Sequence, residues 1–288
     1  MRFEFIAKHR GAWQTRRMCQ TLGVSRAGFY EWMQRPESAR AQRNRLLTVQ
    51  TRTSYEQSDR TYGSPRVWRD LCAWGFSCGE HRVARLMRAA GLQARGKRRR
   101  LPFDVGARPE HSIAPNLLDR QFEATAPNQR WVADFTYIWT EEGWLYFAVV
   151  LDLFSRRIVG WSMNQGMTAE LVTDALVMAI WRRGRPQELL HHSDQGSQYT
   201  SEEFQRLLAE HGVTCSMSRR GDCWDNSAME SFFASLKKER VHRRNYQTRD
   251  EARADLFDYV ERFYNPRRQH STIGYLSPVD FEKVMNSA

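Results

Sequence analysis

Three stretches of alternating hydrophobic and polar residues follow one another in the middle of the chain. They read WVADFTYIWT, WLYFAVVLDLFS and RRIVGWSMN, and a short turn at Glu141-Glu142-Gly143 separates the first two. Alternation with a period of two is typical of β-strands, so these stretches predict an antiparallel meander. The pattern then alternates between helix and strand, in the order helix 168–183, strand ELLHHSD, helix 201–211, strand VTCSMS and helix 225–240.

The resulting order β-β-β-α-β-α-β predicts an α/β fold with a mixed five-stranded sheet, in which the later strands are joined through helices. The first 95 residues differ, because they show helical spacing and capping residues. A helix ends at Gly23 and Ser25 caps the next one; Ser64-Pro65 opens a third helix, and Ser77-Cys78-Gly79-Glu80 forms a capping box before a fourth. Two helix-turn-helix-like pairs are therefore expected, although small helical hairpins are also ordinary packing units.

These changes of pattern divide the chain into four segments. Residues 1–95 are expected to form the helical region with its two helix-turn-helix-like pairs, a type of unit that commonly binds DNA, and 96–125 a basic linker that contains prolines. The α/β catalytic core is expected over 126–245. In 246–288, Thr248 begins a helix whose apolar face should pack against that core, followed by a basic tail.

Positive charge is concentrated in the N-terminal third. Residues 1–100 hold 22 Lys and Arg against 7 Asp and Glu, a net charge of +15, whereas the remaining 188 residues carry −4. So local an excess favours phosphate binding, with a merely solvated surface as the alternative. The predicted DNA-contacting arginines are Arg16, Arg17 and Arg26 in the first helical pair, Arg98 and Arg99 in the linker, and Arg267 and Arg268 in the tail.

Composition excludes several other classes of protein. No stretch of about 18 apolar residues is present and the N-terminus lacks the apolar run of a signal peptide, so we expect a soluble cytoplasmic protein with no membrane partner. The five cysteines are scattered and none are spaced C-x-x-C. Neither a disulfide framework nor a zinc site is therefore predicted.

Three acidic residues stand out because of their positions. Asp134 lies in the middle of an apolar strand, where a carboxylate is unexpected unless a cation meets it. Asp194 ends a strand, and Glu230 lies in the first turns of a helix, with 35 residues between the two. Together they offer three oxygen-bearing side chains to one point.

Simpler interpretations compete with this one. Ser227-x-x-Glu230 is itself a capping box, so Glu230 has an alternative role at its helix start. The neighbouring carboxylates Asp152, Asp222 and Asp225 are each less favoured as metal ligands. Asp152 is expected to pair with Arg156 or Arg157, and Asp225 or Asn226 to cap the helix.

The paired histidines and the tryptophans carry weaker signals. His191 and His192 should face opposite ways on their strand, which argues against a joint metal site, although one of them is a candidate to line the active site. Trp144 and Trp224 are expected to be packing residues.

The sequence resembles the catalytic, OrfB-type transposases of bacterial insertion sequences, which belong to the retroviral-integrase (DDE) superfamily. The resemblance spans nearly the whole chain and rests on WVADFTYI, HHSDQGSQY, DNSAMESFFASLKKE and FYNPRRQHSTIGYLSP, together with the 35-residue separation. It implies a ribonuclease H-like integrase core, and it assigns the catalytic and metal-binding roles to Asp134, Asp194 and Glu230. It also singles out Lys237, seven residues beyond Glu230 on nearly the same helix face, which we assign to a DNA phosphate.

The implied reaction is nicking at an element end followed by attack of the freed 3′-OH on a second phosphodiester. Three carboxylates without a His/Cys cage suit Mg²⁺ or Mn²⁺, and two such ions stabilise both ends of the displacement. The implied partners are double-stranded DNA, both element ends and target, further copies of the chain, and a possible upstream-frame transposase subunit. Two other functions compete: a non-enzymatic helix-turn-helix DNA-binding regulator, and a nuclease acting on RNA in hybrids.

Overall fold

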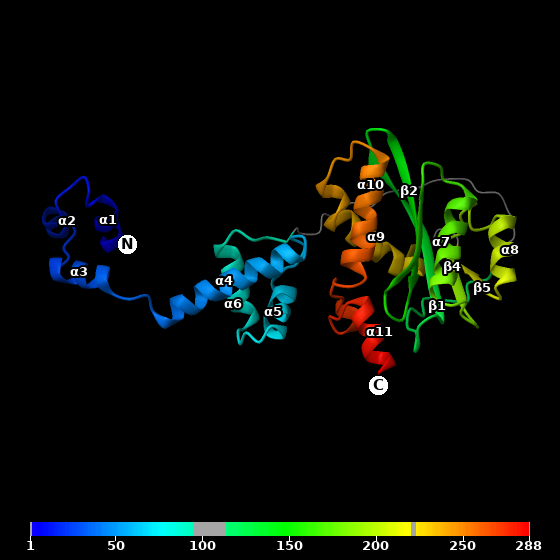
Figure 1. Cartoon of the computed structure of the whole chain (residues 1–288), viewed down its shortest axis with the longest axis horizontal. Helices are drawn as coiled ribbons and strands as arrows, with labels where there is room; N and C mark the ends of the chain where they lie inside the picture. Colours follow the sequence, from blue (N-terminus) through cyan, green and yellow to red (C-terminus); the bar gives the residue numbers. More distant parts are fainter. Residues whose placement is uncertain (1, 95–112, 220–222, 288) are drawn as a thin grey trace.

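The computed structural model describes residues 2–94, 113–219 and 223–287, which form two small helical units and a larger α/β part (Figure 1). The first unit contains α1 (Arg2–His9), α2 (Thr15–Thr21) and α3 (Arg26–Gln34), and the second contains α4 (Ala39–Gln57), α5 (Ser64–Ala73) and α6 (Glu80–Ala89). The α/β part follows as β1 (Arg130–Thr140), β2 (Gly143–Asp152), β3 (Ile158–Asn164), α7 (Ala169–Arg182), β4 (Leu190–Ser193), α8 (Glu202–Glu210), β5 (Thr214–Met217), η1 (Cys223–Asn226), α9 (Ser227–Glu239), η2 (Val241–Arg243), α10 (Arg249–Phe257), η3 (Asp258–Tyr264), η4 (Ser271–Ile273) and α11 (Pro278–Asn286).

The predicted first helical pair is present as α2 and α3. The hydroxyl of Ser25 accepts a hydrogen bond from the Gly28 backbone N–H at 2.8 Å, so Ser25 caps α3 as expected. Helix α1 was not predicted, and its buried Ile6 completes a small core with Met18 and Phe29. The unit is therefore a three-helix module rather than an isolated pair.

The second predicted pair is present as α5 and α6, and a long helix that the sequence analysis missed, α4, packs against both. Pro65 lies in the first turn of α5, as predicted. The capping box at Ser77 is wrong, because the N-cap of α6 is Gly79 and no side-chain cap bond is present. Val67 and Val83 contribute to the shared core of these helices.

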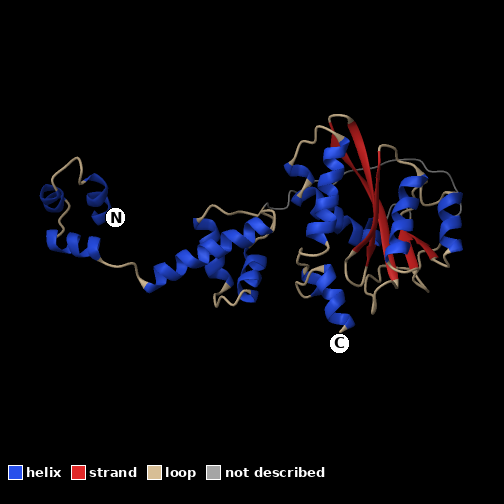
Figure 2. Cartoon of the chain, in the orientation of Figure 1, coloured by secondary structure: helices blue, strands red, loops and turns tan. Residues whose placement is uncertain are grey.

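The strands of the larger part gather in one sheet with helices on either side (Figure 2). The sheet is mixed and five-stranded, as the sequence predicted, with the strand order β3-β2-β1-β4-β5. Strands β1, β2 and β3 form the antiparallel meander, whereas β4 pairs in parallel with both β1 and β5. Strand β1 is thus the point at which the sheet changes from antiparallel to parallel pairing.

Helices cover both faces of the sheet, with α7 and α8 on one side and α9 and α10 on the other (Figure 1). Successive residues of β1 alternate between these sides: Trp131 and Ala133 join the core under α7 and α8, and Val132 joins the core under α9. Asp134 continues this alternation and therefore faces the α9 side.

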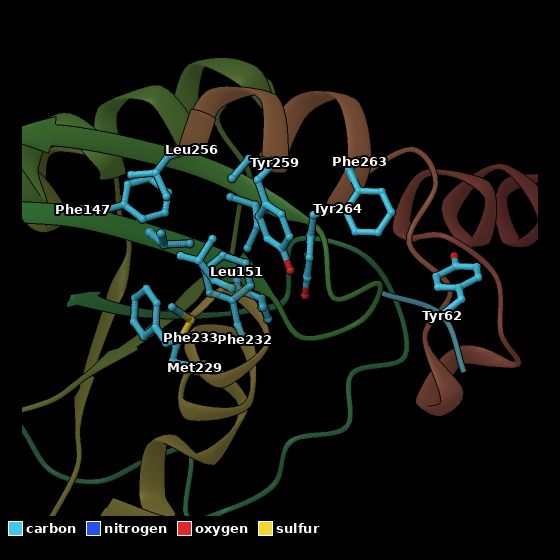
Figure 3. Close-up of a cluster of buried hydrophobic side chains, with 14 of the residues drawn as sticks. Tyr62, Phe147, Leu151, Met229, Phe232, Phe233, Leu256, Tyr259, Phe263 and Tyr264 are labelled. Carbon is cyan, nitrogen blue, oxygen red and sulfur yellow. The ribbon is translucent and has the colours of Figure 1, made fainter. Parts of the chain in front are cut away.

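The core on the α9 side extends from the sheet to the second helical unit (Figure 3). Phe232 and Phe233 of α9 and Tyr259 of η3 lie buried in it, and Tyr62 lies at its far end. The Tyr62 hydroxyl donates to the Arg267 carbonyl oxygen at 3.0 Å and accepts from the Gln269 backbone N–H at 2.9 Å. These bonds attach the second helical unit to the C-terminal segment.

Candidate active site

The parallel pairing of β1 with β4 brings Asp134 and Asp194 side by side. Val132 is paired with His192, and each aspartate lies two residues further along its strand direction. An advance of two residues keeps both side chains on the same face, and neighbouring strands lie about 4.8 Å apart. Two positions separated by 59 residues in the sequence thus become neighbours at the carboxyl end of β4.

Backbone donors orient both carboxylates. Asp134 Oδ1 accepts from the Phe135 N–H at 2.8 Å, and Asp194 Oδ1 accepts from the Gly196 N–H at 2.8 Å. A Cβ atom at Gly196 would lie 2.8 Å from the same Asp194 oxygen, so a side chain at this position would push the carboxylate away. Glycine in the Asp194-Gln195-Gly196 turn therefore preserves the orientation of Asp194.

Asn226, at the start of α9, fixes the third acid relative to β1. Its Nδ2 donates to the Ala133 carbonyl oxygen at 3.1 Å, immediately before Asp134. Glu230 follows in the first turn of α9 with an exposed side chain. Lys237 lies about two turns further along the same helix, at a half-buried position.

Asp225 anchors the segment before α9. Its buried carboxylate accepts from the Arg219 backbone N–H at 2.9 Å, from Arg120 Nε at 3.0 Å and from Asn116 Nδ2 at 2.9 Å. Burial raises the pKa of Asp225, but the Arg219 N–H bond and the guanidinium groups of Arg120 and Arg219 outweigh it, so the pKa is lowered. Asp225 is therefore an ionised anchor that ties the end of the linker to the approach of α9.

Asp194, Glu230 and Lys237 all influence the pKa of Asp134 through their charges. Burial raises the pKa of Asp134 to about 8, with further contributions from the negative charges of Asp194 and Glu230, while the Phe135 N–H and Lys237 act in the opposite direction. Burial lowers the pKa of Lys237, and Asp134 opposes that change. Asp134, Asp194, Glu230 and Lys237 therefore lie close enough together to act on one another through their charges.

Within residues 2–94, 113–219 and 223–287, no group of three or more His, Cys, Asp or Glu side chains lies close enough together to hold a metal ion. Asp134 and Asp194 are neighbours on adjacent strands, and Glu230 interacts with Asp134 through its charge. The backbone positions thus agree with a three-acid site, while the three carboxylates do not converge on one point in this conformation.

Comparison with known proteins decides the family. The chain is 42% identical over 286 residues to the transposase InsF for insertion sequence IS3A of Escherichia coli strain K12, covering 98% of each protein. It is also 41% identical over 268 residues to an insertion element IS600 uncharacterized 31 kDa protein of Shigella sonnei, covering 92% of this chain and 97% of that protein. The chain belongs to the insertion-sequence transposases.

Family models match three parts of this transposase: an integrase core domain over 124–223, a second integrase core domain model over 230–285, and an HTH-like domain over 41–100. The fold is therefore an integrase core of the ribonuclease H-like type preceded by a helical region, as predicted. The HTH-like match covers α4, α5 and α6, which lie after the pair α2 and α3.

Solved structures of retroviral integrases are similar to the transposase. The HTLV-2 integrase catalytic core domain in complex with magnesium aligns at 18% identity with a TM-score of 0.43, covering 55% of this chain and 99% of that one. A simian T-cell lymphotropic virus intasome in complex with PP2A regulatory subunit B56 gamma aligns at 18% identity with a TM-score of 0.47, covering 61% and 60%.

The alternatives for the neighbouring acids are resolved in part. Ser227 is the first residue of α9 rather than its cap, and Asn226 occupies the N-cap position without a side-chain cap bond, so the predicted capping box with Ser227 as its cap is wrong. Asp152 is buried and accepts from two backbone N–H groups, and its ion pair is with Arg183 at 3.7 Å. The expected pairing of Asp152 with Arg156 or Arg157 is therefore also wrong, and Asp222 lies outside the described residues.

His191 and His192 face opposite sides of the sheet, as predicted. The His192 ring lies 2.8 Å from Ser216 Oγ and 3.1 Å from Ser218 Oγ, while His191 packs against aromatic rings under α8. Burial lowers the pKa of His191 to about 3 and that of His192 to about 4. Both imidazoles are neutral at physiological pH, and they share no site.

The predicted DNA-contacting arginines fall into three groups. Arg16, Arg17 and Arg26 are exposed on α2 and α3, and Arg267 is exposed in the tail. Arg98 and Arg99 lie outside the described residues. Arg268 needs a correction, because it is only 6% exposed and its guanidinium binds both carboxylate oxygens of Glu239 at 2.8 Å.

Two aromatic residues also need a correction. Trp144 and Trp224, expected to be packing residues, are 43% and 67% exposed. Exposed Tyr137 and Trp139 lie near Trp144, and the sequence analysis missed both. Their spacing of two along a strand was a signal that they share one face.

Proposed function

We propose that this transposase cuts DNA at the ends of its own element and joins the freed 3′-OH to a target strand. In this proposal Asp134, Asp194 and Glu230 are the catalytic carboxylates and hold divalent metal, Mg²⁺ or Mn²⁺, as two ions. The observation that carries the proposal is the register of β1 with β4, which sets Asp134 level with Asp194 while α9 presents Glu230 nearby.

The donor set fits a hard divalent cation. All three side chains offer oxygen, and Mg²⁺ binds a few carboxylates together with water and phosphate oxygens. Burial is the largest cause of the raised pKa of Asp134, and the negative charges of Asp194 and Glu230 add to it; a bound cation would offset that added repulsion. When bound, the metal supplies Lewis acidity at the attacked phosphodiester and stabilises charge on the attacking and leaving oxygens.

The protein groups then divide the remaining work. Hydrogen bonds from the Phe135 and Gly196 N–H groups hold the two aspartates in place, and exposed Glu230 needs a change of side-chain conformation to join them. Lys237 contributes a positive charge beside Asp134 for a DNA phosphate near the scissile bond.

DNA binding is assigned to the basic N-terminal region. Residues 1–100 carry a net charge of +15, and Arg16, Arg17 and Arg26 are exposed on the first helical module. Arg267 is retained as a contact in the tail, whereas buried Arg268 is not. Since two element ends must meet, we propose that the transposase acts as a homo-oligomer on DNA, and that an upstream-frame subunit is a partner.

A cleavage assay tests this function. The purified chain is incubated with a labelled duplex carrying the ends of its own element, in Mg²⁺, Mn²⁺ or EDTA, and nicked and strand-transferred products are resolved on gels. We expect products in metal and none in EDTA. Glu230→Gln should abolish both products without weakening DNA binding, whereas Glu210→Gln, an exposed carboxylate on α8, should leave both unchanged.

Binding without cleavage would lead to the same assay on a fusion with the upstream frame. If that fusion is also inactive in metal, the proposal fails and a DNA-binding regulator becomes the better description. The match to transposases over 98% of the chain does not favour that alternative.

A further inference from the structure

An exposed aromatic cluster, formed by Tyr137, Trp139 and Trp144, lies on the hairpin of β1 and β2. These side chains are 51%, 54% and 43% exposed. The Trp144 ring packs edge-on against both others, with centroids 5.1 Å from Tyr137 and 4.8 Å from Trp139. Since the burial of large aromatic side chains away from water lowers the free energy, three of them exposed on one surface indicate a binding partner.

The hairpin holds this cluster in a fixed arrangement. Trp139 and Trp144 are directly opposite one another in the antiparallel register. Behind the hairpin, Arg249 donates from Nε to the Trp144 carbonyl oxygen at 3.1 Å and from its backbone N–H to Glu142 at 2.8 Å. The rings are therefore arranged before any partner arrives, which lowers the entropy cost of binding.

Tyr137 and Trp139 follow the alternation of Trp131 and Ala133, so they lie on the opposite side of β1 from Asp134, and the aromatic cluster and the acid site meet around the edge of this strand. Strand β4 pairs with β1 through Val132, and Tyr246 bridges the same edge at Thr140. Between those points α9 passes the edge, and Lys237 Nζ lies 5.2 Å from the centroid of the Tyr137 ring. Lys237 also interacts with Asp134, so it lies between the acid site and the aromatic cluster.

We propose that this aromatic cluster stacks on unpaired bases of the DNA strand that enters the acid site. Lys237 and Arg249 lie on either side of the aromatic cluster and supply positive charge for the phosphates of the same strand. The carboxylate of Glu142, in the turn between β1 and β2, accepts a hydrogen bond from the Arg249 backbone N–H. Aromatic stacking accepts any base and suits a strand that must leave the duplex to be cut and joined. This inference rests on the proposed function for its role, while the binding itself does not depend on cleavage.

Binding measurements on the full-length chain in EDTA test the inference. The probes are a blunt duplex and the same duplex with a single-stranded thymine tail, and we expect the tailed probe to bind at least about fivefold more tightly, the gain from stacking one base. Trp139→Ala and Trp144→Ala should remove that preference and leave blunt-duplex affinity unchanged. Trp181→Ala, which removes a 65% exposed tryptophan from α7, should change neither affinity.

A second readout separates stacking from folding. With 2-aminopurine in the tail, wild-type protein should quench its fluorescence, Trp139→Ala should not, and Trp139→Phe, which retains an aromatic face, should restore quenching. Circular dichroism melts show whether each variant is folded, and an unfolded alanine variant is replaced in every comparison by Trp139→Leu, an apolar side chain that cannot stack.

Several outcomes would overturn the inference. They are an equal affinity of the wild type for both probes, a tail preference that survives Trp139→Ala, or an equal loss of tailed-duplex and blunt-duplex binding in the alanine variants. A change of oligomeric state in the variants, measured by light scattering, would also overturn it, because it would assign the cluster to a second copy of the chain. Because all binding is measured in EDTA, absence of metal-dependent cleavage would count against the proposed function and leave this result intact.

Discussion

Arg268→Ala should strongly destabilise the larger α/β part, because Arg268 is one half of a buried ion pair. Its side chain is 7% exposed and that of Glu239 is 9% exposed. Nε and one terminal nitrogen of Arg268 bind the two Glu239 oxygens at 2.8 Å each, and the same nitrogen donates to Ser235 at 3.1 Å. The Tyr259 hydroxyl completes the shell around Glu239 at 2.8 Å.

The magnitude follows from the carboxylate left behind. Burial raises the pKa of Glu239, but its bonds to Arg268 outweigh this effect and lower the pKa, so Glu239 is ionised at neutral pH. Removing one partner of a buried pair costs about 3–5 kcal/mol. At about 2–4 °C per kcal/mol for a domain of this size, the melting temperature should fall by about 6–20 °C.

Thermal melts at neutral pH, followed by circular dichroism, test this expectation. Arg267→Ala is the matched control, since Arg267 is the exposed neighbour and its substitution should change stability by less than about 0.5 kcal/mol. The double variant Arg268→Met/Glu239→Leu should melt above Arg268→Ala, because no buried charge is left alone. If Arg268→Ala melts within about 2 °C of wild type, or if the double variant melts below the single one, Glu239 is not left as an uncompensated buried charge and the expected loss does not occur.

Three further perturbations probe other parts of the molecule. Because the pKa of Asp134 is raised to about 8, its contribution to stability is present at acidic pH and is lost as the pH rises from about 4 through 8. In EDTA, Asp134→Asn should therefore raise the melting temperature at about pH 9 and have little effect near pH 4. Equal effects at the two pH values would contradict this. Gly160→Ala would place a Cβ 2.1 Å from a backbone oxygen of α7, and it should lower the free energy of unfolding, measured by chemical denaturation, by at least about 1–3 kcal/mol. Gly79→Ala is the control, because the space around Gly79 is open, and it should lower that free energy by less than about 1 kcal/mol. Tyr62→Phe leaves two backbone groups of the C-terminal segment without their partner and should cost about 1–3 kcal/mol, with faster hydrogen exchange at the Gln269 amide; unchanged exchange there would show that Tyr62 does not hold this contact.

Local patterns predicted the elements whose burial follows a simple period. The alternation in WVADFTYIWT predicted β1, and the hydroxyl of Ser25 predicted the start of α3. Helix α4 was missed because its buried positions include Thr51 and Ser54, which read as polar in the sequence. Its apolar stripe was therefore too weak to reveal a helix.

Side-chain environments set by distant partners could not be predicted. Arg268 looked like a phosphate ligand in a basic tail, and its burial depends on Glu239, 29 residues earlier in the sequence. Trp144 looked like a core residue, but its exposure depends on which part of the sheet the helices leave uncovered. By contrast, Asp134 was detectable because a carboxylate contradicts the apolar pattern of its own strand.

The position of the acid site follows from the change of pairing at β1. On one edge β1 is bonded to β2 along its whole length, while on the other β4 accompanies it for the residues Arg130–Val132. Asp134 lies just beyond that point, level with Asp194, so the two carboxylates meet at the carboxyl end of β4, where sites gather in α/β sheets. Helix α9 passes the same edge of β1 and carries Lys237 to the Tyr137 ring of the aromatic cluster. Under the two proposals, one DNA strand would pass from the carboxylates to Lys237 and then around the edge of β1 to the aromatic cluster, so Lys237 would serve both surfaces.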